Sequence, residues 1–354
     1  MLSQNNFGAR LRSSDFIYLY GTALSITNAN YVDTTIYLLP TNKLIILVAG
    51  LLFSHTRNTI MAPSSLVVVS FNTESGGRPH FDDYVKTLVT EKSPDVIAFQ
   101  EVHHATKTSA PRFFMPKDPG KRKHPIRLHL FAELKKLLGE DYKAYYTPHL
   151  VGVHDLEPCD YDGRYGQALF VHTRCVVRFF WSDFIFGSYN QFNTEYQNGK
   201  PAGKAALGVS LLIPSGQQVI LSNIHGFWSR LGKVDMPERF VQNEGINHHL
   251  KRIKSAVAND SFVICVGDLN YRSDLQALED LRLQPMFGAY GGVVLNHTFG
   301  VACTRTSHYD KVALEPEADF MIACQKLADH AVYLKTDFDA PSDHSPLTAR
   351  FVFP

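Results

Sequence analysis

The segment FVICVGDLN, residues 262–270, joins a run of apolar residues to a polar end. β-Branched and aromatic residues dominate the run, which predicts a buried strand. Asp268 and Asn270 are two positions apart, so on an extended chain both side chains project to the same face. The segment therefore predicts a strand that presents a carboxylate and an amide side by side where it ends.

The same arrangement recurs along the chain. VVVSFN ends in Asn72, DVIAFQE ends in Glu101, and VILSNIH ends in His225. In sheet proteins, polar groups at strand ends can converge on one rim, where a rigid scaffold fixes them in a cleft. We therefore predict that these side chains meet, as a metal site requires.

Further apolar runs and a few amphipathic stretches indicate the fold class. Many strands with few helices are typical of two packed sheets covered by helices, which is an α/β architecture. The predicted strands are 66–71, 95–100, 165–172, 204–213, 217–225, 262–270, 318–323 and 347–353, and the predicted helices are 81–92, 127–139 and 237–257.

Composition indicates a folded protein without a strong overall charge. The 354 residues are 45% hydrophobic and 19% charged, which is ordinary globular usage. A formal charge of +1 gives no global basic field of the kind that attracts nucleic-acid polymers. The five cysteines form no CxxC pair, which suits a reducing compartment and favours a cytoplasmic protein.

The first sixty residues differ from the rest, so we divide the chain into an N-terminal extension, 1–60, and a catalytic domain, 61–354. The extension contains LIILVAGLLF, 44–53, whose ten residues are half of what a membrane span needs. We expect no stable membrane span. Secretion through a signal sequence and a translated leader upstream of Met61 remain alternatives.

Carboxylates and amides among the polar positions suit a hard divalent cation. Mg²⁺ prefers oxygen ligands and binds through one or two carboxylates while keeping waters and substrate phosphate. Glu101, Asp268 and Asp343 supply carboxylates. Asn72 and Asn270 add amide groups that can contact a metal, position phosphate or orient water without adding negative charge.

Two histidines and one further acid complete the candidate set. Hydrolysis of a phosphoester needs proton transfer near neutral pH, which His225 and His344 can provide. Asp319 lies inside the apolar run ADFMIA. Because a buried carboxylate is costly unless it is paired, we predict that Asp319 pairs with one of these imidazoles.

The motifs SFN, QE, NIHG, GDLN, ADF and SDHSP, in this order, resemble those of the endonuclease/exonuclease/phosphatase superfamily. That superfamily includes deoxyribonuclease I-like nucleases, abasic-site endonucleases, inositol polyphosphate 5-phosphatases and neutral sphingomyelinases. The resemblance runs from about Leu66 to the C-terminus. It implies a four-layer sandwich of two mainly antiparallel sheets flanked by helices, and Mg²⁺-dependent hydrolysis of phosphoesters, with Mn²⁺ as a possible substitute.

The resemblance also implies roles for individual residues. Glu101 is the principal metal ligand, with Asn72 and Asp343 nearby. Asp268 and Asn270 align the attacking water and the scissile phosphate. His344 contacts the phosphate or activates water with Asp319 behind it, and His225 stabilises the transition state or assists the leaving group. The substrate-binding residues that it implies are Tyr165, Lys204 and Arg272.

The substrate is less well defined. GDLNYR, which ends in Arg272, is similar to a motif of the inositol 5-phosphatases, but TRTSHYDKVALEPEADF lacks their Trp/Cys/Asp/Arg-type motif. That segment and HGFWSRLGKVDMPER look similar to uncharacterised bacterial members. We slightly favour a phosphatase or phosphodiesterase acting on a small or lipid head-group substrate. The alternatives are a DNA or RNA nuclease and a non-catalytic binding module of the same fold.

Other conspicuous residues have simpler interpretations. We predict that the adjacent His103 and His104 lie in a solvated loop, since neighbours on a strand point apart. His248 and His249 fall on a predicted helix and are expected to be exposed. Three aromatic residues could stack on a substrate or pack beneath the rim, namely Tyr165, Phe227 and Trp228.

Overall fold

The computed structural model describes residues 64–353 apart from 116–123, 152–162, 189, 192–202, 230, 258–259, 310, 311 and 313. The extension predicted for residues 1–60, with its apolar run, lies outside the described residues, so the predictions about it stay predictions. Within the described ranges, no helix is both long and apolar enough to span a membrane.

Two sheets form the body of residues 64–353. The strand order is β14-β15-β1-β2-β6-β5-β8 in the first sheet and β12-β13-β11-β10-β9-β7 in the second. The first sheet contains β1 (Ser64–Asn72), β2 (Val96–Ala105), β5 (Tyr142–Val151), β6 (Gly163–His172), β8 (Asn190–Gln191), β14 (Ala331–Thr336) and β15 (Leu347–Phe353). The second contains β7 (Val176–Phe186), β9 (Lys204–Leu212), β10 (Gln218–His225), β11 (Phe262–Asp268), β12 (Gly292–Val294) and β13 (Asp319–Cys324).

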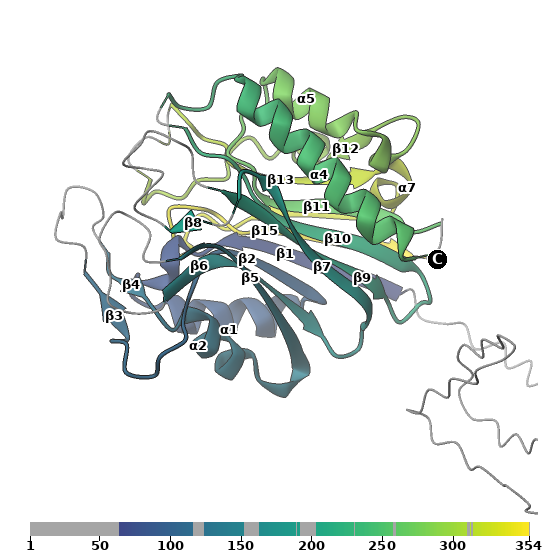
Figure 1. The fold of residues 1–354 in the computed structure, drawn as a ribbon. Helices are drawn as coiled ribbons and strands as arrows, with labels where there is room; N and C mark the ends of the chain where they lie inside the picture. Colours follow the sequence, from purple (N-terminus) through teal and green to yellow (C-terminus); the bar gives the residue numbers. More distant parts are fainter. Residues whose placement is uncertain are drawn as a thin grey trace, which may run out of the picture. The chain divides into compact units, whose positions relative to one another are not determined.

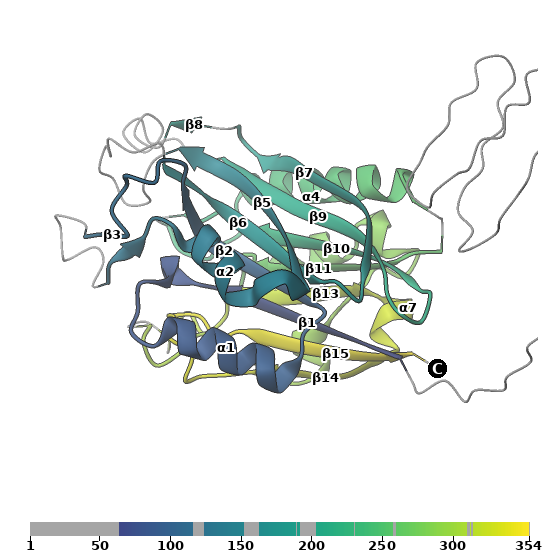
Figure 2. The same cartoon turned by 90° about the horizontal axis from the view of Figure 1, so that it is seen from below.

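Helices cover the outer faces of both sheets. Figure 1 shows α4 and α5 over the second sheet, and Figure 2 shows α1 and α2 over the first. The helices are α1 (Phe81–Lys92), α2 (Leu130–Leu138), α4 (Pro237–Ser255), α5 (Gln276–Arg282), α6 (Leu295–Thr298) and α7 (Gln325–Ala328). Among the described strand pairs, β1–β2, β5–β8 and β10–β11 run parallel and the others antiparallel. The predicted four-layer α/β sandwich is confirmed.

Alternating side chains of β1 build two separate cores. Leu66 and Val68 belong to the cluster shared with the second sheet, whereas Val69 and Phe71 belong to the cluster beneath α1 and α2. Successive side chains of a strand point to opposite faces, so a run that is apolar at every position suits a strand covered on both sides. This explains why the run carries no polar alternation.

A buried amide connects the two sheets close to the strand ends. Asn223 on β10 donates from Nδ2 to the backbone oxygens of Phe99 and Ala168, each at 3.0 Å, in the other sheet. Its Oδ1 accepts a 2.6 Å hydrogen bond from Nε2 of Gln100. All of the amide's hydrogen-bonding groups are therefore used, which makes its burial affordable and fixes how the sheets dock.

Several elements differ from the sequence prediction. The helix predicted for 127–139 begins at Leu130, because Ile126–Arg127 pairs with Phe113–Phe114 as the short ribbon β3–β4. The Arg127 side chain is held there by Asp82 and Glu133. Strands β5, β7 and β14 lie outside the predicted runs. Of these, β5 contains Pro148, and its pairing with β6 shifts register just after that residue.

Two predictions about histidines were wrong. His103 lies in β2, which continues to Ala105, and it is buried with Nε2 3.1 Å from Oγ of Ser75. His248 is exposed as expected, but His249 is buried. The face of α4 that carries His249 packs on β9, where Gly208 leaves room for the imidazole ring.

Candidate active site

The first part of the site is built by β1 and β2, which run parallel. Asn72 ends β1 and pairs in register with Gln100, the residue before Glu101. Glu101 has a φ of 58°, and the pairing of β2 with β6 shifts register around it. A left-handed conformation is costly for a residue with a side chain and is found mostly where function constrains the backbone. It turns Glu101 out of the regular alternation of the strand.

The amide of Asn72 joins carboxylates from both sheets. Its Nδ2 donates to Oδ2 of Asp268 at 2.9 Å and to Oε1 of Glu101 at 3.3 Å, and its Oδ1 accepts from the backbone N–H of Glu74 at 3.0 Å. Asn72 is fully buried. The structure therefore brings together three of the predicted residues, and in this arrangement Asn72 holds the two acids in place.

The second sheet contributes Asp268 and Asn270, but not on one extended strand. β11 ends at Asp268, and Asn270 has a φ of 55°. The backbone N–H of Asn270 donates to Oδ1 of Asp268 at 2.9 Å, while its Nδ2 lies 3.4 Å from the oxygen of Gly226. The expected shared face is thus replaced by a turn that directs the amide toward the residue after His225.

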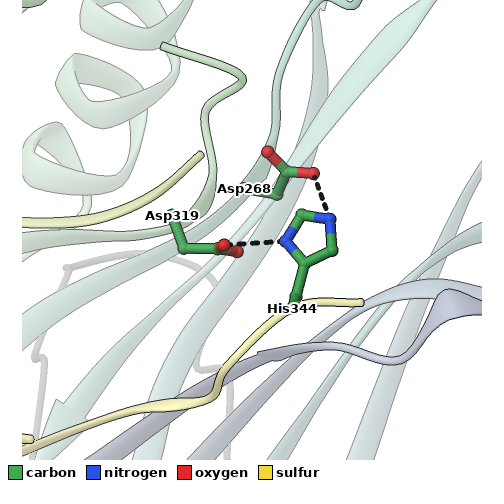
Figure 3. Close-up of side chains that lie close together, drawn as sticks. All are labelled: Asp268, Asp319 and His344. Atoms are coloured by element: carbon green, nitrogen blue, oxygen red, sulfur yellow. Dashed lines mark hydrogen bonds and ion pairs between the residues drawn. The ribbon is translucent and has the colours of Figure 1, made fainter. Parts of the chain in front are cut away.

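Asp319 pairs with His344, as the cost of burying its carboxylate predicted. Oδ2 of Asp319 accepts a hydrogen bond from Nδ1 of His344 at 2.7 Å, and Nε2 of the ring lies 3.6 Å from Oδ2 of Asp268 (Figure 3). All three side chains are buried, and their potential ligand atoms lie within 4.8 Å of one another. This arrangement can relay a proton, and it can also hold a metal ion.

The electrostatics of this group are those of a crowded buried site. Burial raises the pKa of Asp268, and the charge of His344 opposes the increase. Burial and Arg305 disfavour the charged form of His344, but Asp319, Asp343 and Asp268 outweigh them and raise its pKa to about 9.

Arg305 is a functional candidate that the sequence prediction missed. It is almost fully buried, its Nη1 donates to Oδ2 of Asp343 at 3.2 Å, and the same nitrogen contacts Nε2 of His344. The guanidinium is a donor in every state, so in this contact Nε2 of the neutral ring is the acceptor.

Two of the predicted substrate-binding residues lie beside these acids. Lys204 begins β9, is buried, and lies within electrostatic reach of Asp268 and Glu101; burial lowers its pKa to about 8 despite both acids. Tyr165 is also buried, with its ring 6.1 Å from that of His225 and 5.0 Å from that of His149, between ring centroids.

Of the remaining predicted residues, His225 and Asp343 lie close to the group formed by Asp268, Asp319 and His344. Nε2 of His225 lies 3.9 Å from Oδ2 of Asp268, and the backbone N–H of Asp343 donates to Glu74 at 3.1 Å. Arg272 is not brought into the group, because its guanidinium pairs with Asp274 at 2.8 Å near the surface. A substrate-binding role for Arg272 stays a prediction.

The aromatic residues after His225 divide between the two interpretations that the sequence left open. Phe227 is buried and its ring lies 5.1 Å from that of Phe186, between centroids, so it packs beneath the rim. Trp228 is 49% exposed and is available to an incoming molecule. Lys233 in the same loop is buried near Asp319 and was not predicted.

Comparison with known proteins gives one family and several solved structures. The profile of the endonuclease/exonuclease/phosphatase family matches residues 69–344. A family protein from Leptotrichia buccalis is 15% identical with a TM-score of 0.57, covering 81% of this chain and 100% of its own. No curated protein matches the chain.

Two further similar structures are a phosphatase and a catalytic domain with a bound anion. The mannosyl-6-phosphatase of Bacteroides thetaiotaomicron is 12% identical with a TM-score of 0.55, over 81% of this chain and 100% of that one. The human Nocturnin catalytic domain, solved with a bound sulfate anion, is 17% identical with a TM-score of 0.51, over 82% and 95%. At these identities the likeness concerns the fold.

Proposed function

Because the chain belongs to the endonuclease/exonuclease/phosphatase family and is thus a metal-dependent hydrolase of phosphoester bonds, we propose that it is a Mg²⁺-dependent phosphatase or phosphodiesterase that acts on a small or lipid head-group substrate. We further propose that residues 61–354 form the catalytic domain and that the protein works in the cytoplasm.

The proposal rests on one observation: basic side chains and carboxylates lie together in one buried group. The guanidinium of Arg305 and the imidazole of His344 meet the carboxylates of Asp268, Asp319 and Asp343 here. A buried guanidinium beside an imidazole suits an anionic oxygen of a substrate, because charge-assisted hydrogen bonds are strong in a buried site. A phosphate oxygen has the required charge.

The oxygen ligands that the site offers suit a hard cation. Glu101 and Asp343 offer carboxylate oxygens, and Asn72 holds Glu101 through its amide nitrogen. This oxygen-only set fits Mg²⁺, with Mn²⁺ as a substitute, better than softer metals that prefer imidazole or thiolate. When bound, the cation would neutralise charge on the phosphate and polarise the bond that is cleaved.

The protein's own residues would carry the proton steps. Asp268 and Asn270 would align the water, because the carboxylate can accept its hydrogen bond and the amide can contact the phosphate. His344 would donate from Nε2 to the phosphate while Asp319 holds its Nδ1. His225, near Asp268, would assist the leaving oxygen.

Near-neutral charge and the GDLNYR motif support the choice of a small or head-group substrate over a polymer. A nuclease remains the second candidate, and the exposed Trp228 is the observation that favours it, because an aromatic ring at the rim can stack on a base. A binding module without activity is the third candidate.

A substrate panel tests the proposal. The protein is assayed with phosphoinositides, sugar phosphates, bis(p-nitrophenyl) phosphate, plasmid DNA and abasic DNA, each with Mg²⁺, Mn²⁺ or EDTA. We expect Mg²⁺-dependent release of phosphate or alcohol from a small substrate, and its loss in the Glu101→Gln variant. Cleavage of polymers alone, with steep salt dependence, would favour the nuclease. No hydrolysis in any mixture would leave the binding module.

A further inference from the structure

Lys233 is a buried cation for which the described part of the chain supplies no carboxylate in an ion pair. It lies in the loop 226–236, between β10 and α4, and only 5% of its surface is exposed. Its Nζ donates to the backbone oxygen of Glu317, two residues before Asp319. Among the described residues it forms no ion pair, although burial of an unpaired ammonium is costly. A buried cation next to a group of acids is therefore a candidate functional residue.

The ammonium group lies within electrostatic reach of the site described above. Burial lowers its pKa to about 8 and Arg305 adds to this decrease, while Asp268, Glu315 and Asp319 oppose it. An ammonium has three N–H donors, and the oxygen of Glu317 is the one acceptor of Lys233 within the described part of the chain. The remaining donors are available to an anionic ligand.

The loop that carries Lys233 is held by a second buried cation. Arg239, on the first turn of α4, is fully buried. Its Nε donates to the oxygen of Val234 at 2.8 Å, Nη1 to that of Phe227 at 3.3 Å and Nη2 to that of Gly232 at 3.4 Å. All three acceptors belong to the loop, and two of them bracket Lys233. The guanidinium therefore fixes the path of the loop around Lys233.

The next turn of α4 anchors the segment that follows Asp268. Nε2 of Gln242 lies 3.1 Å from the hydroxyl of Tyr271, which donates to Oδ1 of Asn243 at 2.7 Å. Oε1 of Gln242 accepts from the backbone N–H of Phe227. The loop of Lys233 and the turn of Asp268 thus share one rigid support, so their relative position is fixed.

We propose that Lys233 is a further phosphate-contacting residue and that Arg239 is the positioning residue that holds its loop. This rests on the proposed function. Lys204 interacts electrostatically with Asp268 and Glu101, whereas Lys233 interacts with Asp268, Glu315, Asp319 and Arg305. The two lysines would therefore contact different oxygens of the phosphate.

Binding of inorganic phosphate to the full chain tests the proposal without requiring turnover. Calorimetric titrations are run in EDTA and again in Mg²⁺ for the wild type, Lys233→Met and Lys251→Met. Lys251 is an exposed lysine of α4 and serves as the matched control. We expect Lys233→Met to weaken phosphate binding by about 10-fold or more, as the loss of a charge-assisted hydrogen bond predicts, and Lys251→Met to leave it unchanged. Lys233→Arg, which keeps the charge, should recover part of the affinity.

Equal phosphate affinity in Lys233→Met and the wild type would overturn the proposal, as would a wild type that binds no phosphate in either buffer. The variant Arg239→Lys keeps the charge but loses the planar fork of donors. We expect it to weaken phosphate binding as Lys233→Met does. Affinity at the wild-type level would overturn the positioning role, and if the variant does not fold, Lys233→Met decides alone. A wild type that binds phosphate but hydrolyses no substrate would refute only the proposed function.

Discussion

Replacement of His249 by phenylalanine should change how the free energy of unfolding depends on pH. His249 is fully buried on α4, and neither ring nitrogen has a hydrogen-bond partner among the described residues. Burial lowers its pKa from 6.5 to about 4. The folded state therefore keeps the ring neutral, while the unfolded chain accepts a proton more readily.

The sign and size of the effect follow from this difference in pKa. Because the folded pKa is below the unfolded one, the unfolded state binds more protons between pH 6.5 and about 4. The contribution of the neutral His249 ring to the free energy of unfolding is fully present above pH 6.5. It is lost as the pH falls toward about 4. At about 1.4 kcal/mol per pKa unit, the loss reaches roughly 2 kcal/mol near pH 5 and about 3 kcal/mol below pH 4.

Urea unfolding of the full chain near pH 7.5 and pH 5, followed by far-UV circular dichroism, measures this loss. His249→Phe removes the titrating group and keeps a ring of similar size. Between pH 7.5 and pH 5, the free energy of unfolding of this variant should therefore decrease less than that of the wild type, by roughly 2 kcal/mol. His248→Gln, at the exposed neighbouring position, is the control and should behave as the wild type does. Equal pH dependence in His249→Phe and the wild type would refute the reasoning.

Three further substitutions test the site and its support. Asp319→Asn should lower kcat by about 10²- to 10⁴-fold, because the imidazole of His344 loses its charged partner. Asp329→Asn, on the exposed surface, is the control and should leave kcat unchanged. A near-wild-type kcat in Asp319→Asn would contradict the proposed role of Asp319. Glu101→Gln should weaken Mg²⁺ binding by at least about 10-fold in calorimetry, and unchanged binding would exclude Glu101 as a ligand. Gly208→Ala should lower stability by about 1–3 kcal/mol in thermal unfolding, since its Cβ would lie 2.2 Å from Cδ1 of Ile253; an unchanged melting temperature would show that α4 shifts easily.

Site residues at strand ends were predictable because the local sequence pattern marks where a strand ends. A β-branched run that stops at a polar residue identifies both the strand and the side chain at its end, as for Asn72 and Asp268. Asn270 was misplaced because spacing alone does not reveal that the strand stops at Asp268 and the chain turns into a left-handed conformation. The fold class followed from the number of such runs.

Two loop residues of the site were not predictable for the opposite reason, whereas Asp343 and His344, also in a loop, were found only through the resemblance of the SDHSP motif. Arg305 and Lys233 belong to segments without strand or helix periodicity, and they reach the site only because distant contacts direct those segments. His249 shows a related limit: its helix was predicted, but the face that packs on β9 depends on the gap at Gly208 in another strand. Which face of a helix is buried, and which loop residue reaches the site, depends on contacts between positions far apart in the chain.

The amide of Asn223 has an evolutionary consequence. The acids and imidazoles of the site come from both sheets, and this side chain sets how the sheets meet just beneath them. A lineage with this architecture can therefore vary the parts of its rim loops that carry no reacting group, and with them the molecules it accepts, while the buried amide keeps the two sheets in the same relative position.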